Sequence, residues 1–142
     1  MVNKPKRIGT AGESAARDFA QLNGFPWADR RPLKGNKDEG DLLLSPGLIA
    51  EVKSGDKARN ASDQQVTRWL QETETERVNA NADLAVLILT RWRKPVERWW
   101  AITQTPAIEI PGPVVQVRMY LGDFLTYARH LGYGTPLEDV AA

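Results

Sequence analysis

Two short apolar segments around a Ser45-Pro46-Gly47 breaker constrain the fold of this chain more than any other feature. Residues 41–44 read Asp-Leu-Leu-Leu and residues 48–51 read Leu-Ile-Ala-Glu, and both have the length and composition of strands. Proline and glycine favour a turn between them. A three-residue loop sets a register in which Leu44 faces Leu48, Leu43 faces Ile49, Leu42 faces Ala50 and Asp41 faces Glu51. The pattern predicts a buried hairpin with two carboxylates at its open end.

The paired carboxylates of Asp41 and Glu51 are unfavourable unless something offsets their charge. Side chains that face each other across a sheet lie roughly 5 Å apart at Cβ, and like charges there destabilise it. A divalent metal would offset this charge, because Mg²⁺ and Mn²⁺ prefer carboxylate oxygens as ligands. Strand alternation puts Lys53 on the face of Glu51 and points Val52 into the core. An ammonium group there can position or deprotonate a water, which is typical of a metal-dependent phosphodiesterase site.

Gly40-Asp41, the triplet Glu51-Val52-Lys53 and Glu13 on an expected first helix form a wider set. Together they resemble the PD-(D/E)XK nuclease superfamily, and within it most closely the archaeal-type and phage Holliday junction resolvases. The resemblance covers roughly residues 9 to 90, and it also includes Gly9, Gly12, Arg30, Arg31, Gly35 and a helix starting near Ser62. Gly40 replaces the proline that names the motif, which is a common variation.

The resemblance implies a restriction-endonuclease-like α/β fold, in which a mixed β-sheet is flanked by helices. It also implies metal-dependent cleavage of DNA, with four-way (Holliday) junctions as substrate, by a homodimer. Mg²⁺ or Mn²⁺ would be bound by the residues that match Glu13, Asp41 and Glu51, while Lys53 would activate the attacking water and Gln65 would support the site. Two other functions stay open: a different nuclease of this fold (repair, restriction, single-strand or flap cleavage), and a non-catalytic DNA-binding module.

Local structure offers simpler alternatives for some of these residues. Glu51 and Lys53 fit a solvated strand edge, because short strands often end in charged residues. Thr10-Ala11-Gly12-Glu13 is a capping box, in which Glu13 returns to the backbone of Thr10, and Ser62-Asp63-Gln64-Gln65 is a second one. Capping alone therefore accounts for Glu13 and Gln65.

Positive charge is concentrated near the N-terminus, although the net charge of the whole chain is only +1. Residues 1–37 carry Lys4, Lys6, Arg7, Arg17, Arg30, Arg31, Lys34 and Lys37, against Glu13, Asp18 and Asp29. Such asymmetry suits a nucleic-acid face. We expect DNA phosphates to be contacted by Arg7, Arg30, Arg31 and Lys34. The alternative is an N-terminus whose charge serves solubility alone.

Composition bounds the remaining possibilities. A chain of 142 residues with 42% hydrophobic content is expected to form one domain, 1–142, with a basic tail at 1–9 and a C-terminal tail at 134–142. The absence of cysteine excludes disulfides and thiolate metal sites, and a single histidine, His130, excludes multi-histidine zinc sites. No apolar segment suggests a membrane span or signal peptide, so a cytoplasmic location is expected. The resemblance to phage enzymes extends this expectation to a phage-encoded protein inside a bacterial host.

The expected secondary structure alternates helices with strands. In chain order it comprises a helix at 10–23, a proline-interrupted strand at 25–33, a polar loop at 34–40, the hairpin, a helix at 62–80, strands at 84–90, 98–103 and 114–119, and a helix at 121–131. The inward faces of the first two helices are expected to carry Ala11, Ala15, Phe19 and Leu22, and Val66, Trp69 and Leu70. Glu72, Glu74 and Glu76 are expected on a solvated helix face.

Basic and aromatic residues alternate around Pro95, in Arg91-Trp92-Arg93-Lys94 and Arg98-Trp99-Trp100. Bases that stack on tryptophan, with arginine on phosphates, would make this segment a nucleic-acid patch. The alternative is structural: strand alternation sends either Trp99 or Trp100 into the core and leaves the other for a dimer interface.

Overall fold

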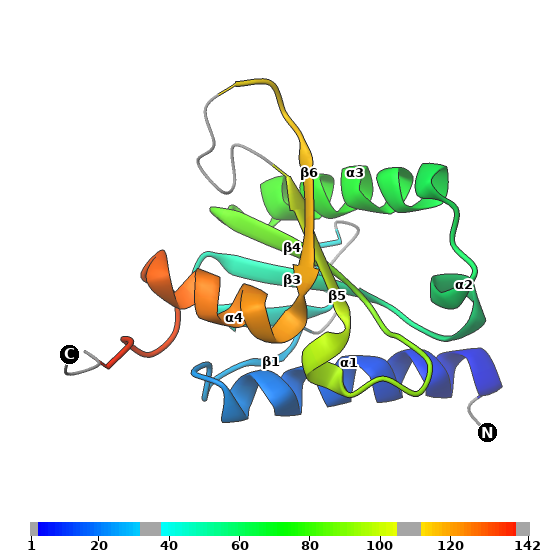
Figure 1. The fold of residues 1–142 in the computed structure, drawn as a ribbon, viewed down its shortest axis with the longest axis horizontal. Coiled ribbons are helices and arrows are strands. Elements are labelled where there is room, and N and C mark those ends of the chain that lie inside the picture. The colour runs from blue at the N-terminus through cyan, green and yellow to red at the C-terminus, as the bar shows by residue number, and fades with distance from the viewer. Residues whose placement is uncertain (1–2, 32–37, 105–111, 139–142) are drawn as a thin grey trace.

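Six strands form one mixed β-sheet with helices on both faces (Figure 1), which confirms the expected α/β class. The computed structural model describes residues 3–31, 38–104 and 112–138. The elements in chain order are α1 (Lys4–Leu22), β1 (Asp29–Arg30), β2 (Leu42–Ser45), β3 (Leu48–Lys53), α2 (Gly55–Arg59), α3 (Asp63–Asn79), β4 (Leu84–Leu89), the 3-10 helix η1 (Val96–Arg98), β5 (Trp100–Gln104), β6 (Gln116–Tyr120) and α4 (Leu121–His130). The strands cross the sheet in chain order, and β3 and β4 pair in parallel.

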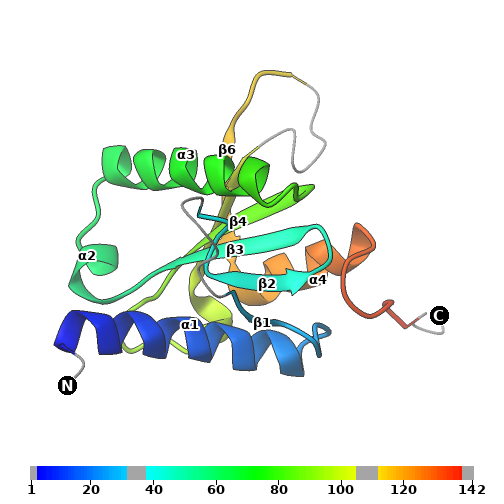
Figure 2. The ribbon, with the colours of Figure 1, turned by 180° about the vertical axis from the view of Figure 1, so that it is seen from behind.

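The sheet is covered by α1 and α4 on one face and by α3 on the other (Figures 1 and 2). β4 shows this arrangement most clearly, because all six of its residues are buried. Val86 and Ile88 pack toward α1 and α4, whereas Leu87 and Leu89 pack toward α3. Cover on both faces explains why the sequence of β4 is a continuous apolar run, as predicted for a central strand.

α1 begins at Lys4 rather than at Thr10. The side chain of Asn3 caps the helix, because its Oδ1 accepts a hydrogen bond of 2.9 Å from the Lys6 N–H. Pro5 lies in the first turn, where the missing N–H costs nothing. The expected basic tail is therefore wrong for residues 4–9, which are helical, and so is the expected cap at Thr10, which lies inside the helix.

The buried face of α1 consists of small residues spaced four apart, Gly12, Ala16 and Ala20. The expected face is rotated from this one: Ala15 and Phe19 are half-buried, whereas Ala11 is exposed and Leu22 is 86% exposed. Only small residues fit on this face, because α1 lies very close to the end of β3. A Cβ atom added at Gly12 would collide with the Oγ of Ser54.

Substitution of two glycines in α1 should have opposite effects on stability. Gly9→Ala should raise the free energy of unfolding by about 0.5–1 kcal/mol, because alanine favours the helix and nothing lies within 4 Å of the added Cβ. Gly12→Ala should lower it by about 1 kcal/mol, since crowding against Ser54 outweighs the same helical gain. Urea denaturation of both variants measures these changes. A neutral Gly9→Ala would mean that residues 4–9 are not helical in solution.

The hairpin keeps only part of the expected register. Leu42 pairs with Ala50 and Leu43 with Ile49, as predicted, but Ser45 rather than Leu44 pairs with Leu48. The prediction for Leu44 is wrong because the strand is irregular between Leu43 and Ser45. The turn accordingly shrinks to Pro46 and Gly47, and Gly47 adopts a φ of +83°. Proline followed by a residue with positive φ is typical of a type II turn.

The other elements differ mainly at their ends. α3, β4 and α4 match their expected ranges to within one residue at each end, whereas α2 and η1 were not expected. In the described part of the strand expected at 25–33, only Asp29–Arg30 is strand, while residues 32–33 and the first four residues of the loop expected at 34–40 lie outside the described residues. The first part of the expected C-terminal tail is anchored, since Thr135 donates to the Gly24 carbonyl (2.8 Å) and Arg129 donates to the Thr135 carbonyl (2.9 Å). In the described ranges, no helix combines the length and apolarity needed to cross a membrane.

Candidate metal centre

Asp41 lies directly before β2, where β2 and β3 separate. The hairpin ladder ends with Leu42 opposite Ala50. Beyond this pair, the Val52 N–H donates a hydrogen bond of 2.8 Å to Asp41 Oδ2. The carboxylate thus takes the place of a backbone carbonyl. Burial and the neighbouring charge of Glu51 raise the pKa of Asp41 to about 7. The two carboxylates are therefore close, although the paired register ends one residue short of them, where the Asp41 N–H donates to the Ala50 carbonyl at 3.0 Å.

Glu51 and Lys53 share the face of β3 that packs against α3. Their partners on β4 are Leu87 and Leu89, which contact α3, and Val52 points to the opposite face, as strand alternation predicts. Lys53 Nζ lies 3.7 Å from Glu51 Oε1 and 5.6 Å from the centre of the Trp69 ring. The ammonium group is therefore held between a carboxylate and an aromatic face.

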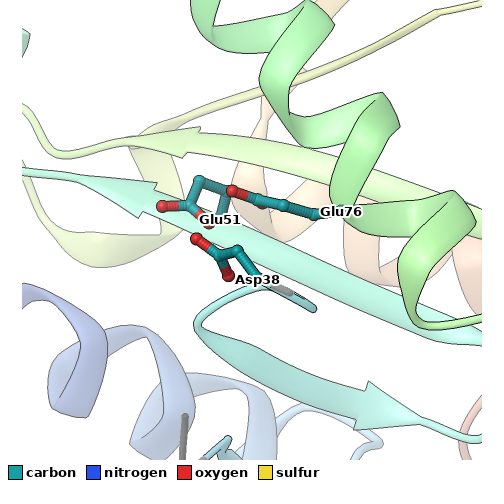
Figure 3. A group of neighbouring side chains, drawn as sticks. All are labelled: Asp38, Glu51 and Glu76. Carbon is teal, nitrogen blue, oxygen red and sulfur yellow. The ribbon is translucent and has the colours of Figure 1, made fainter. Parts of the chain in front are cut away.

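Three carboxylates converge on this face from separate elements (Figure 3). Glu51 belongs to β3, Glu76 reaches down from α3, and Asp38 lies in the segment before β2. One oxygen from each lies within 4.8 Å of the others. Oxygens that bind one Mg²⁺ or Ca²⁺ ion at about 2.0–2.6 Å lie at comparable separations. Across ranges 3–31, 38–104 and 112–138, this is the one acidic group with such close spacing.

The cluster contains buried oxygen atoms that lack hydrogen-bond donors. Glu51 is 6% exposed and Glu76 is 7% exposed. Within the described part of the chain, no donor contacts Oε2 of either side chain. A buried carboxylate oxygen without a partner is costly, and either a proton or a cation removes that cost. Hard carboxylate oxygens are the ligands that Mg²⁺ and Mn²⁺ prefer, so the residues present fit such an ion.

Without a cation, these carboxyl groups retain protons at unusually high pH. Burial and the proximity of Glu76 raise the pKa of Glu51 to about 9. Burial, together with the charges of Asp38 and Asp41, raises the pKa of Glu76 to about 7. Adjacent acids that cannot all ionise are characteristic of metal sites and catalytic sites, where a cation or a reaction uses the charge.

Glu13 projects from α1 toward the same end of the hairpin. It cannot cap the helix, because it lies in the helix interior, and its Oε2 instead pairs with Arg30 Nη2 at 2.8 Å. Burial and the charge of Asp41 raise the pKa of Glu13. The ligands expected from the resemblance, Glu13, Asp41 and Glu51, are thus successive electrostatic neighbours, whereas the closest cluster joins Glu51 to Asp38 and Glu76.

The remaining predicted residues have mixed surroundings. The Gln65 N–H donates to Ser62 Oγ at 3.1 Å, which confirms the expected cap of α3. Arg31 pairs with Glu39 at 2.5 Å, and Arg7 is exposed on α1. Lys34 lies outside the described residues. The roles of Gln65 in the site and of the four basic side chains in DNA contact remain predictions.

Sequence reasoning missed Asp38 and misjudged Glu76. The expected solvated position is wrong for Glu76, which is buried, whereas Glu72 is exposed. A signal for Glu76 was present, because the buried positions of α3 recur every three or four residues: Val66, Trp69, Leu70, Thr73 and Glu76. Asp38 carries no such signal, since only the tertiary fold brings its loop beside α3.

The raised pKa values predict how the metal-free protein responds to pH. Unfolded carboxyl groups ionise near pH 4, whereas Asp41, Glu76 and Glu51 hold protons up to about pH 7 or 9 in the folded state. The folded state binds more protons in this window, so the free energy of unfolding should fall as pH rises from about 4 to about 9. Thermal denaturation in EDTA across this range measures the fall. Glu51→Gln should show a shallower decline, and curves parallel to the wild type would contradict the assignment.

No family model, curated protein or solved structure matches this chain.

Proposed function

We propose that this protein is a divalent-metal-dependent DNA endonuclease of the PD-(D/E)XK type that resolves four-way junctions. The observation that carries the proposal is the environment of Glu51. This side chain is more than nine-tenths buried, has an oxygen without a hydrogen-bond donor in the described residues, and lies 3.7 Å from the Lys53 ammonium. A cation site next to a fixed positive charge is what metal-assisted phosphodiester hydrolysis needs.

The proposed roles follow from the positions of the side chains. Glu51 would bind the metal together with Asp38 and Glu76, or together with Asp41, whose pKa its charge raises. Mg²⁺ or Mn²⁺ bound there would polarise the phosphate and favour formation of hydroxide from water. Lys53 would orient the attacking water and offset the charge of the phosphate.

The proposed substrate is supported by charge and by the absence of a recognisable base-reading motif in the sequence. Arg7, Arg30, Arg31 and Lys34 would contact phosphates, which position DNA without reading its sequence. An enzyme of this kind selects shape rather than sequence. Each chain would supply one active site, and two symmetric cuts in a junction require two, so the proposed enzyme acts as a homodimer. A DNA substrate also accords with an intracellular location.

Incubation of purified protein with labelled DNA tests the proposal. A four-way junction, a flap, a linear duplex and a single strand are compared in Mg²⁺, in Mn²⁺ and in EDTA. We expect paired symmetric cuts in the junction with either metal and none in EDTA. Faster cleavage of the flap or the single strand would support nuclease activity but reject the four-way junction as the preferred substrate. Binding of DNA without cleavage of any substrate would identify a non-catalytic module instead.

A further inference from the structure

A second feature is a cleft of about 560 Å³ on the α1 side of the molecule. Its lining comes from the first half of α1, from the segment between β4 and β5, and from α2 with the residue before it. These three segments gather at the end of the molecule where the N-terminus lies (Figures 1 and 2). The wall from α1 is one helical face, formed by Lys4, Ile8, Ala11, Gly12 and Ala15.

The cleft lies at the carboxyl ends of two parallel strands. Ser54 and Gly55 follow β3 directly, Thr90 and Arg91 follow β4 directly, and all four residues line the cleft. In open α/β sheets, ligands commonly bind outside the carboxyl ends of parallel strands. Ser54 is only 5% exposed, and its hydroxyl has no hydrogen-bond partner in the described ranges. Its Oγ is packed against Gly12 of α1, where an added Cβ would collide with it.

The charge of the lining is strongly positive. Its basic residues are Lys4, Arg59, Arg91, Arg93 and Lys94, and its one acidic residue is Asp56. This imbalance contrasts with the net charge of +1 for the whole chain. A cleft with one sign of charge concentrates ligands of the opposite sign, so an anion is favoured here.

Trp92 gives the cleft an aromatic surface beside these cations. Its side chain is 64% exposed, and the guanidinium groups of Arg59 and Arg93 lie 5.7 and 5.4 Å from the centre of its ring. An exposed indole next to cations is the arrangement on which single-strand-binding proteins stack a base.

The segment that carries Trp92 is held in place by its own hydrogen bonds. Arg91 Nη1 donates to the Arg98 carbonyl at 2.9 Å, and Trp99 Nε1 donates to the Lys94 carbonyl at 3.3 Å. Arg93 has a φ of +58°, a conformation that side-chain-bearing residues rarely adopt. The indole is therefore presented on a braced turn, which lowers the entropy that binding must remove.

We infer that this cleft binds an unpaired nucleotide of single-stranded nucleic acid, with the base on Trp92 and the phosphates on the surrounding lysines and arginines. Binding by the cleft stands on these contacts alone. Only the location of that nucleotide next to the cleaved bond rests on the proposed function. Ser54 follows Lys53 directly, and Gly12 precedes Glu13, so the cleft and the carboxylates are neighbours in the chain.

The test is fluorescence anisotropy with a labelled oligothymidylate of about ten nucleotides, which is within the site sizes of single-strand binders. EDTA is present, so cleavage plays no part. Trp92→Ala should weaken binding roughly 5- to 100-fold, the range expected for loss of one stacked base. Trp27→Ala is the matched control, because Trp27 is 86% exposed and does not line the cleft. It should leave affinity unchanged.

Competitors identify the source of the nucleotide. A blunt duplex and thymidine monophosphate should each compete much more weakly than the single strand. Equal competition by the monophosphate would reject single-stranded nucleic acid as the ligand and indicate a site for a free nucleotide. Equal competition by the duplex, or equal losses in Trp92→Ala and Trp27→Ala, would overturn the inference. If the protein binds the single strand but cuts no DNA, the proposed function is rejected and the inference that the cleft binds single-stranded nucleic acid stands.

Discussion

Glu51→Gln is expected to abolish metal-dependent cleavage of DNA while leaving the protein folded. Glutamine preserves the shape of the side chain but removes the charge that a cation requires. Even residues that only support metal ligands typically contribute 10- to 100-fold, so loss of a direct ligand should lower the cleavage rate by roughly 100-fold or more. The variant should also be more stable than the wild type in EDTA near pH 8, because a neutral amide replaces a buried carboxyl group that shares its surroundings with Glu76.

The matched control for this variant is Glu72→Gln. Glu72 lies on α3 like Glu76, is exposed, and carries the same charge. Its substitution changes the net charge equally and should leave cleavage and stability within measurement error. Cleavage by Glu51→Gln at the wild-type rate would remove the metal centre from the proposal.

Two further substitutions, each of which replaces a carboxylate by an amide, distinguish the alternative ligand sets around Glu51. Glu76→Gln weakens the closest carboxylate cluster, whereas Asp41→Asn weakens the set that the resemblance implies. Asparagine at 41 still offers an oxygen to the Val52 N–H, so the end of the hairpin should stay intact. The variant with the larger loss of Mn²⁺ affinity, measured by calorimetric titration, identifies the second ligand of the ion.

Lys53→Ala is expected to lower cleavage by roughly 10²- to 10⁴-fold, the usual contribution of a general acid or base, while Mn²⁺ binding persists. The lysine lies 3.7 Å from Glu51 Oε1, and its proposed partners are the water and the phosphate rather than the ion. Its removal also takes a positive charge away from the cation site, so metal affinity should be unchanged or slightly higher. Calorimetry with Mn²⁺ and single-turnover cleavage separate the two effects.

Lys57→Ala provides the comparison, because Lys57 is an exposed lysine on α2 only four positions away. It should cleave like the wild type. If Lys53→Ala instead loses Mn²⁺ affinity as fully as Glu51→Gln does, the lysine organises the metal site, and its proposed role in activating water is incorrect.

The parts of this fold that could be predicted are those in which local sequence and packing demand the same structure. The Pro46-Gly47 turn and the alternation of Glu51, Val52 and Lys53 specify the hairpin, and the apolar run of β4 specifies a strand covered on both faces. The start of α1 was misplaced, although Asn3 and Pro5 are helix-start signals, because Thr10 to Glu13 offers an equally good local cap. Local patterns do not decide which of two possible caps starts the helix. That choice depends on tertiary packing, such as the contact of Gly12 with Ser54.

The candidate site was predictable only within the hairpin. Asp41, Glu51 and Lys53 lie within 13 residues of one another, so strand geometry alone relates them. Asp38 and Glu76 are separated by 38 positions, and only the packing of α3 on the sheet brings them together. The same limit applies to Trp99 and Trp100: the local pattern leaves open which of them is buried, and the structure buries Trp99, which lies just before β5, among residues of α1 and α4.

α1 connects the two regions that matter most in this molecule. A helix of 19 residues is about 28 Å long and behaves as a stiff rod. Ile8 lines the cleft on the same rod that carries Glu13 to Arg30 and the neighbourhood of Asp41. An occupant that displaced the first turns of α1 would consequently shift Glu13 as well, without any intermediate hinge.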